Sequence, residues 1–265
     1  MNAVAASNEA AQGSPLQSQL FTYLLRLADA NLILAQRLGE LIGHAPALEE
    51  DLGLANIGLD LLGQARMLLT YAGEVEGKGR DEDALAFLRE QREFFNPLLV
   101  EQPNGDFGFT MVRQFLFDAW QVELYGSMLQ SSDQRLAAIA GKAIKEAQYH
   151  LRFSAGWLVR LGDGTQLSHE RVQRSLDQLW SYTMELFDAD EVDTALVAAG
   201  IAPDPALLRV QWNEQVAAVL SEATLKRPLD RPYLWYGKRG QHSEHLGHLL
   251  APMQYLQRTY PGATW

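Results

Sequence analysis

The chain of 265 residues contains no cysteine. This absence excludes disulfides, cysteine-ligated zinc, iron–sulfur clusters and a thiol nucleophile. Positive charge is also scarce, since 22 Lys and Arg stand against 33 Asp and Glu and give a net charge of -11. Because an acidic chain repels phosphate backbones and anionic lipid surfaces, we expect neither nucleic-acid binding nor membrane docking.

Long apolar runs are missing as well, and no stretch approaches the ~20 residues that a membrane-spanning helix needs. Residues 1–15 are rich in Ala, Ser, Asn, Gln and Gly and have neither the basic start nor the apolar run of a signal peptide. We interpret them as a disordered leader that precedes one domain over residues 16–265. The sequence therefore predicts a cytoplasmic protein.

Apolar residues recur at steps of three and four along most of the chain, which predicts helices. No alternating run of β-branched residues indicates a strand. The expected long helices cover about 16–43, 47–72, 109–129 and 133–161, and further helices are expected near 81–95, 168–187, 190–199, 204–223 and 241–258. Two long helices, a crossover from Gly73 to Phe107 and two more long helices are typical of a ferritin-like bundle. The expected fold is all-α, a ferritin-like helical bundle with additional C-terminal helices.

The second helix is unusually apolar, because Asp60 is the only charged residue between Asp51 and Arg66. Its expected core stripe consists of Leu48, Leu52, Ala55, Leu59, Leu62 and Leu69, widened by Leu54, Leu61 and Leu68. We expect this helix to be covered on most sides. Since it has more apolar circumference than a single bundle covers, it also predicts a subunit interface.

Ferritin-like di-iron proteins take a Glu from each of two helices and a Glu-x-x-His pair from each of the other two. The six histidines of this chain are His44, His150, His169, His242, His245 and His248, and the residues three positions before them are Leu41, Ala147, Gln166, Arg239, His242 and His245. None of these is acidic, so the signature is absent. The sequence predicts no catalytic, cofactor-binding or metal-binding residue in this chain.

Four polar residues on the long helices remain candidates for a remnant site: Asp60, Glu123, Glu146 and His150. Glu146 and His150 stand one helical turn apart, and we interpret them as a structural hydrogen-bonded pair rather than an acid/base couple. Asp118 flanks the apolar stripe of the third long helix. Asp29 lies opposite the leucine stripe of the first helix, so an inward role is doubtful.

Two further clusters have the residue types of metal sites. His242, His245 and His248 lie three residues apart beside Glu244, so a surface metal site is possible there. Residues 188–193 are rich in Asp and Glu but lack the glycine at position six and the acid at position twelve of a calcium loop. We interpret the acidic run as the N-cap of the next helix.

Several long segments resemble a known family. They are 56–66 (NIGLDLLGQAR), 100–105 (VEQPNG), 143–153 (AIKEAQYHLRF), 185–191 (ELFDADE), 242–246 (HSEHL) and 253–258 (MQYLQR). Together they resemble the C subunits of bacterial phenylacetyl-CoA epoxidases, which act in phenylacetate degradation. The resemblance runs from about Leu16 to Trp265, and only the leader departs from it.

The resemblance implies a non-catalytic structural subunit of a multicomponent oxygenase. In that family the A subunit is similar in fold, carries the di-iron centre and binds the CoA thioester, while the C subunit pairs with it without a working metal site. A small B subunit and a reductase complete the system. Two other hypotheses remain open: a self-sufficient metal oxygenase that uses Asp60, Glu123, Glu146 and His150, and a helical small-molecule-binding protein.

Overall fold

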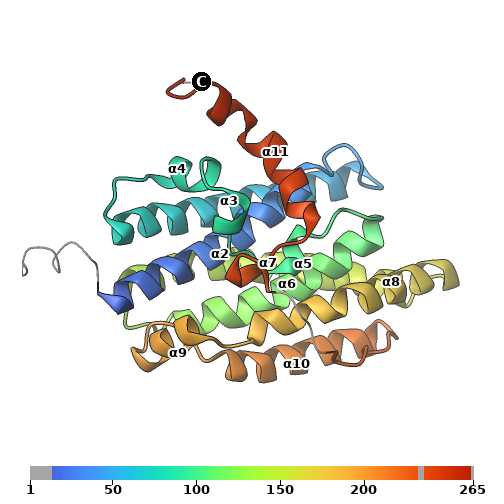
Figure 1. Ribbon diagram of the computed structural model, residues 1–265. Helices are drawn as coiled ribbons and strands as arrows, with labels where there is room; N and C mark the ends of the chain where they lie inside the picture. The colour runs from blue at the N-terminus through green and yellow to red at the C-terminus, as the bar shows by residue number, and fades with distance from the viewer. Residues whose placement is uncertain (1–13, 232–235, 264–265) are drawn as a thin grey trace, which may run out of the picture.

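The computed structural model describes residues 14–231 and 236–263, and every regular element within these ranges is a helix (Figure 1). The expected leader falls outside them up to residue 13. Ser14 caps the first helix, since its side chain accepts a hydrogen bond from the amide of Gln17. No helix in the described part of the chain is long and apolar enough to cross a membrane.

Four long helices form the bundle in two antiparallel pairs. The first pair is α2 (Pro15–Gly39) and α3 (Leu48–Glu76), and the second pair is α6 (Phe107–Met128) and α7 (Gln134–Gly162). Asp106 and Asp133 cap the two helices of the second pair by accepting hydrogen bonds from amides of the first turn. Because the order of the pairs and the long crossover match the expectation, the predicted ferritin-like bundle is confirmed.

The crossover between the pairs contains three short helices, α4 (Glu82–Phe87), η1 (Gln91–Glu93) and α5 (Leu98–Glu101). It covers the side of α2 that faces away from the bundle centre. Asp29 is fully buried there, where it forms an ion pair with Arg89 and accepts a hydrogen bond from the amide of Phe95 at 2.8 Å. The carboxylate therefore faces away from the bundle centre, as expected, but it anchors the crossover.

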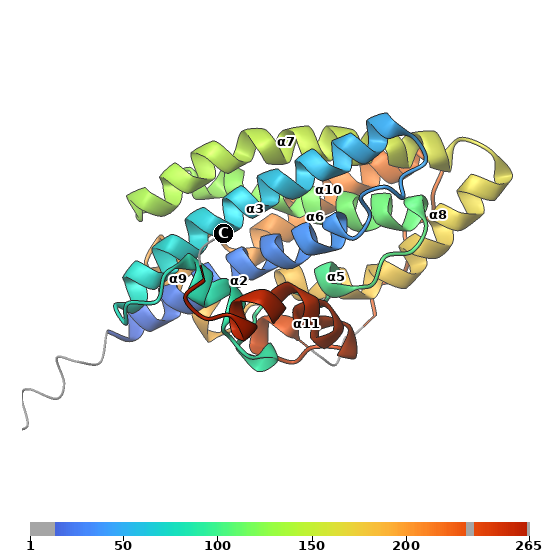
Figure 2. The same ribbon diagram turned by 90° about the horizontal axis from the view of Figure 1, so that it is seen from above.

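The C-terminal third of the chain packs around the bundle, with α8, α9 and α10 on one side (Figures 1 and 2). Its elements are α8 (Gln166–Leu179), η2 (Trp180–Phe187), α9 (Glu191–Ala198), α10 (Pro205–Glu222), η3 (Gly237–Arg239) and α11 (Glu244–Thr259). As a result α2 and α6 are buried on nearly every side. By contrast, α11 extends away from the body and packs mainly on α4 and η1.

The burial of α3 differs from the sequence-based expectation. The core residues of this helix are Leu54, Ile57, Leu61, Ala65, Leu68, Leu69 and Ala72. Most of the predicted stripe lies on the outside instead, and Leu48, Leu52, Leu59 and Leu62 are exposed. The prediction failed because both sides of α3 are apolar, so periodicity alone does not distinguish them. The expectation that this helix is covered on most sides was wrong for the isolated chain.

Candidate functional site

The centre of the four-helix bundle holds a network of amide and tyrosine side chains. Asn31 of α2 donates a hydrogen bond to the Tyr125 hydroxyl at 3.0 Å, and that hydroxyl donates to Gln64 Oε1 at 3.0 Å. Gln121 donates to Asn31 Oδ1 at 2.5 Å. Gln64 then donates to Glu146 Oε2 at 2.9 Å, which extends the network to α7. One side chain or more from each long helix thus contributes to the same buried cluster.

This network is almost free of charge. Asn31, Gln64, Gln121 and Tyr125 are all buried, and Glu146 at the edge is its only carboxylate. Burial raises the pKa of Tyr125 well above its ordinary value, so its hydroxyl keeps the proton that it donates. A buried amide network that is almost fully hydrogen-bonded ties the four long helices together in the bundle core, the region in which di-iron proteins hold their ligands.

A second polar link joins α3 to α7, one helical turn from the contact between Gln64 and Glu146. The Nε2 atom of buried His150 lies 3.0 Å from Asp60 Oδ2, and the Asp60 side chain is 39% exposed. Glu146 does not contact His150 in this way, because its carboxylate accepts from Gln64. The predicted Glu146–His150 pair was therefore wrong: helical spacing placed both residues near α3, but each bonds to a different residue across the helix interface.

Asp118 of α6 is a second fully buried carboxylate of the bundle. It accepts hydrogen bonds from Gln114 at 2.6 Å and Ser154 at 2.7 Å. Burial raises the pKa of Asp118 from 3.8 to about 6, although the charge of His150 and the two hydrogen bonds oppose the rise. The sequence identified Asp118 only as a residue beside the apolar stripe.

The four candidate residues of a remnant site do not converge. Asp60 and His150 bond to each other, and Glu146 accepts a hydrogen bond within the amide network. The pKa of Glu123 is raised by burial and by the negative charge of Glu214 on α10. Within residues 14–231 and 236–263, no three acidic or histidine side chains are grouped so as to hold a metal ion. Neutral amides and a protonated tyrosine are poor replacements for the carboxylates and imidazoles of a di-iron centre. The donor set therefore does not fit that cofactor.

The C-terminal histidines are also separated. His242 precedes α11, and its two ring nitrogens lie 2.8 Å from Glu101 Oε2 and 2.7 Å from the carbonyl oxygen of Phe94. Burial alone would lower the pKa of His242, but the hydrogen bond and charge of Glu101 raise it overall. Both ring nitrogens of His242 thus bond to the crossover and hold the start of α11 against it. The acidic run 188–193 acts as expected, since Asp190 forms a capping box at the start of α9.

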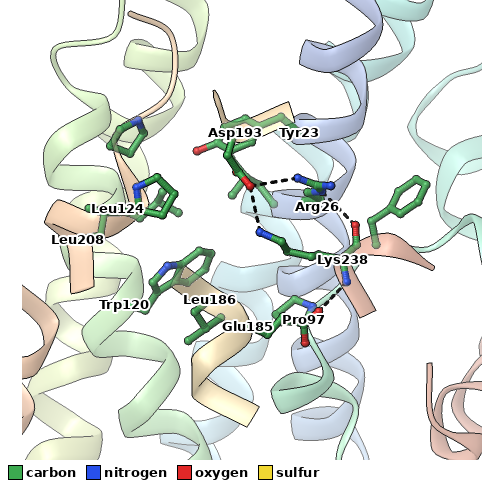
Figure 3. Close-up of a pocket in the computed structure, with 14 residues that line it drawn as sticks. Tyr23, Arg26, Pro97, Trp120, Leu124, Glu185, Leu186, Asp193, Leu208 and Lys238 are labelled. Carbon is green, nitrogen blue, oxygen red and sulfur yellow. Dashed lines mark hydrogen bonds and ion pairs between the residues drawn. The ribbon is translucent and has the colours of Figure 1, made fainter. Parts of the chain in front are cut away.

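A small cavity of about 60 Å³ lies between α2, α6, η2 and α10 (Figure 3). One wall is charged: Lys238 Nζ lies 3.0 Å from Asp193 Oδ2, and Arg26 donates to the Lys238 carbonyl oxygen at 3.1 Å. The other wall is apolar and contains the indole of Trp120. This volume is far below the roughly 300–1,000 Å³ of a small-molecule site, so the cavity is too small for a ligand of that kind.

Two buried carboxylates connect the C-terminal segment to the core. Glu185 accepts hydrogen bonds from the backbone amides of Leu98 and Lys238 at 2.8 and 2.7 Å. Glu101 accepts from the amide and the hydroxyl of Ser243, both at 2.7 Å. Sequence reasoning missed these roles because their partners are more than 50 positions away and include backbone groups. Glu185 and Glu101 each lie within a short apolar segment. An acidic residue in such a segment was the sequence feature that could have indicated a buried carboxylate.

Comparison with known proteins adds independent findings. The family described as "Phenylacetic acid catabolic protein" matches residues 1–265. A relative from Escherichia coli (strain K12), named as the C subunit of 1,2-phenylacetyl-CoA epoxidase, is 58% identical over 248 residues, which cover 94% of this chain and the whole of the relative. The segments that carried the resemblance thus belong to a similarity that extends along most of the chain.

Proposed function

The chain belongs to the phenylacetic acid catabolic protein family, and we propose that it is the C subunit of a phenylacetyl-CoA epoxidase. In this role it pairs with a di-iron A subunit and supports it without an active site of its own. We further propose that the small B subunit and the reductase act on the same complex in the cytoplasm. The similarity over the whole length of the relative supports the assignment.

The amide network at the bundle centre is the observation that carries the non-catalytic role. A di-iron carboxylate protein needs at least four acidic side chains and two histidines at this place. Here Asn31, Gln64, Gln121 and Tyr125 occupy the centre and satisfy one another by hydrogen bonds. Binding two metal ions would break these bonds and leave a cationic centre in a network that contains only one carboxylate, Glu146, which is strongly unfavourable in a buried site. The self-sufficient oxygenase is therefore the weaker hypothesis.

Iron content and turnover test the proposal. The pure chain is incubated with ferrous iron under reducing conditions, passed through a desalting column and analysed for metal, with the A subunit treated in parallel as the positive control. We expect no stoichiometric iron in this chain and no epoxidation of phenylacetyl-CoA until the other subunits are added. Two iron ions per chain, or turnover by this chain with reductase alone, would overturn the non-catalytic role.

A further inference from the structure

The outer side of α3 carries a row of exposed leucines, Leu48, Leu52, Leu59 and Leu62, which we call the α3 ridge. Leu59 is 68% exposed and Leu48 is 69% exposed, although both are large apolar side chains on a helix of the bundle. From the first to the last residue the ridge extends about 20 Å at the rise of an α-helix. A continuous apolar row of this length on a folded protein indicates a protein interface.

The surroundings of the α3 ridge are those of an open face. In the described part of the chain α3 packs mainly against α2, α4 and α7, whereas α8 and α10 pack on α6 and α7, on the other side of the molecule (Figure 1). A shallow hollow of about 240 Å³ borders the ridge, and Leu62, Leu69 and Phe87 contribute to its wall. The hollow also has charged lining residues, because Arg66 Nε lies 3.2 Å from Glu82 Oε1 there.

A fixed carboxylate marks the α7 side of this surface. Asp60 is partly exposed, and His150 holds its Oδ2 atom at 3.0 Å. Tyr149 is exposed beside it, with its ring centroid 6.2 Å from that of His150. Because His150 is buried and fixes the orientation of Asp60, the carboxylate is prepared to accept a charge-assisted hydrogen bond from an incoming cation.

The charge of the chain selects among the possible occupants. A second copy would also carry a net charge of -11, so two copies would repel each other over long range. A different helical protein with a basic group opposite Asp60 has no such penalty. A ridge of leucines fits the groove between two helices of a partner, which is how helical surfaces usually interdigitate.

We propose that the α3 ridge docks into an apolar groove between two helices of the A subunit, with a partner Arg or Lys bound to Asp60. This inference rests on the proposed function and specifies the surface and the chemistry of the contact. Permanent hetero-complexes commonly bury on the order of 2,000 Å². The ridge is therefore the centre of the contact, and the Asp60 and Tyr149 region forms its polar edge.

Charge insertion into the ridge tests the proposal. The double variant Leu52→Glu/Leu59→Glu is titrated with the A subunit by calorimetry, and Leu207→Glu is the matched control. Leu207 is 65% exposed and lies on α10, on the far side of the molecule from α3. We expect the double variant to raise Kd about 100-fold or more, as loss of a central apolar contact does, and the control to change it less than about twofold.

The role of Asp60 needs a separate variant. Asp60→Asn keeps the size of the side chain and should weaken binding about tenfold, with a smaller dependence on salt than the parent chain shows. If the ridge variants bind the A subunit as tightly as the parent, the proposed surface is wrong while the partnership stands. If the parent chain does not bind the A subunit, the proposed function fails and this inference with it. A dimer of this chain that Leu59→Glu dissociates would assign the ridge to self-association and overturn the inference.

Discussion

Single residues in the bundle interior show how burial changes acid–base behaviour. Asp118 has two hydrogen-bond donors and a nearby histidine, yet its pKa rises to about 6 because the site is fully buried. The unfolded chain releases this proton near pH 4. Between about pH 4 and pH 6 the folded state consequently binds more protons than the unfolded state, so rising pH favours unfolding. Keeping Asp118 ionised at neutral pH therefore lowers the free energy of unfolding. An amide of the same size at this position would carry no charge and would avoid that loss.

We predict that Asp118→Asn stabilises the chain at pH 7. The amide oxygen can still accept from Ser154, and no charge has to be buried. The gain in unfolding free energy should reach at most about 3 kcal/mol, which is the equivalent of the pKa shift, and should nearly vanish at pH 4. Chemical denaturation at both pH values measures it. Glu222→Gln on the exposed end of α10 is the control and should change stability by less than about 0.5 kcal/mol. An equal gain at both pH values would contradict the explanation by ionisation.

Among the helices, α11 is held in position by a small number of side-chain hydrogen bonds. It extends from the body and packs mainly on α4 and η1. Its entry is held by the carboxylate of Glu101, which accepts hydrogen bonds from Ser243 and contacts His242. Farther along, Arg258 donates to Glu90 and to backbone oxygens of the crossover. The buried anchor should matter more than the exposed ion pair, because solvent screens the latter.

We predict that Glu101→Ala loosens α11 without unfolding the four-helix bundle. The substitution leaves the amide of Ser243 and the ring of His242 without their buried partner, at a cost of about 1–3 kcal/mol for each group. Hydrogen exchange followed by mass spectrometry should show faster exchange in residues 241–259 and unchanged exchange in α6 and α7. Glu90→Ala, which removes the exposed partner of Arg258, is the matched control and should have a small effect. Uniform acceleration over all helices would mean that Glu101 supports the whole fold.

Helix caps and other hydrogen bonds between residues that are close in the chain were predictable from the sequence. The caps by Asp133 and Asp190 follow from short-range rules, and so do the helix boundaries within a few residues. The absent Glu-x-x-His spacing showed that the di-iron signature is missing, but it did not predict the amide network at the bundle centre. Long-range pairing was not predictable: His150 bonds to Asp60 across 90 positions, and Glu101 reaches residue 243. Neither side of α3 is polar enough to identify the core, so its orientation required the tertiary structure.

At the scale of the whole molecule, the chain combines a dense interior with an apolar outer face on α3. The core extends through the bundle and into the C-terminal helices, where Trp180 and Trp212 pack at a centroid distance of 5.4 Å. The α3 ridge is the contrasting region. If the proposed partner covers the ridge, it removes further apolar surface from water and thereby stabilises the folded chain.

We predict that the A subunit raises the melting temperature of this chain in a concentration-dependent manner. A partner that binds only the folded state adds about 2.7 kcal/mol when its free concentration is 100 times Kd. For a domain of this size each kcal/mol corresponds to roughly 2–4 °C. Thermal unfolding at increasing partner concentration measures the effect, with an unrelated acidic helical protein as the control. A constant melting temperature over a range that exceeds Kd would show that the partner does not prefer the folded chain.

The burial of α2 also affects how the protein is made. Arg26 donates to the carbonyl oxygen of Lys238, 212 positions later, and Arg37 donates to the carbonyl oxygen of His245. At a synthesis rate of about 5–20 residues per second, the ribosome needs roughly 10–40 s to add the residues between Arg26 and Lys238. During that interval α2 lacks these two partners. The covering of α2 is thus completed only after most of the chain has been synthesised.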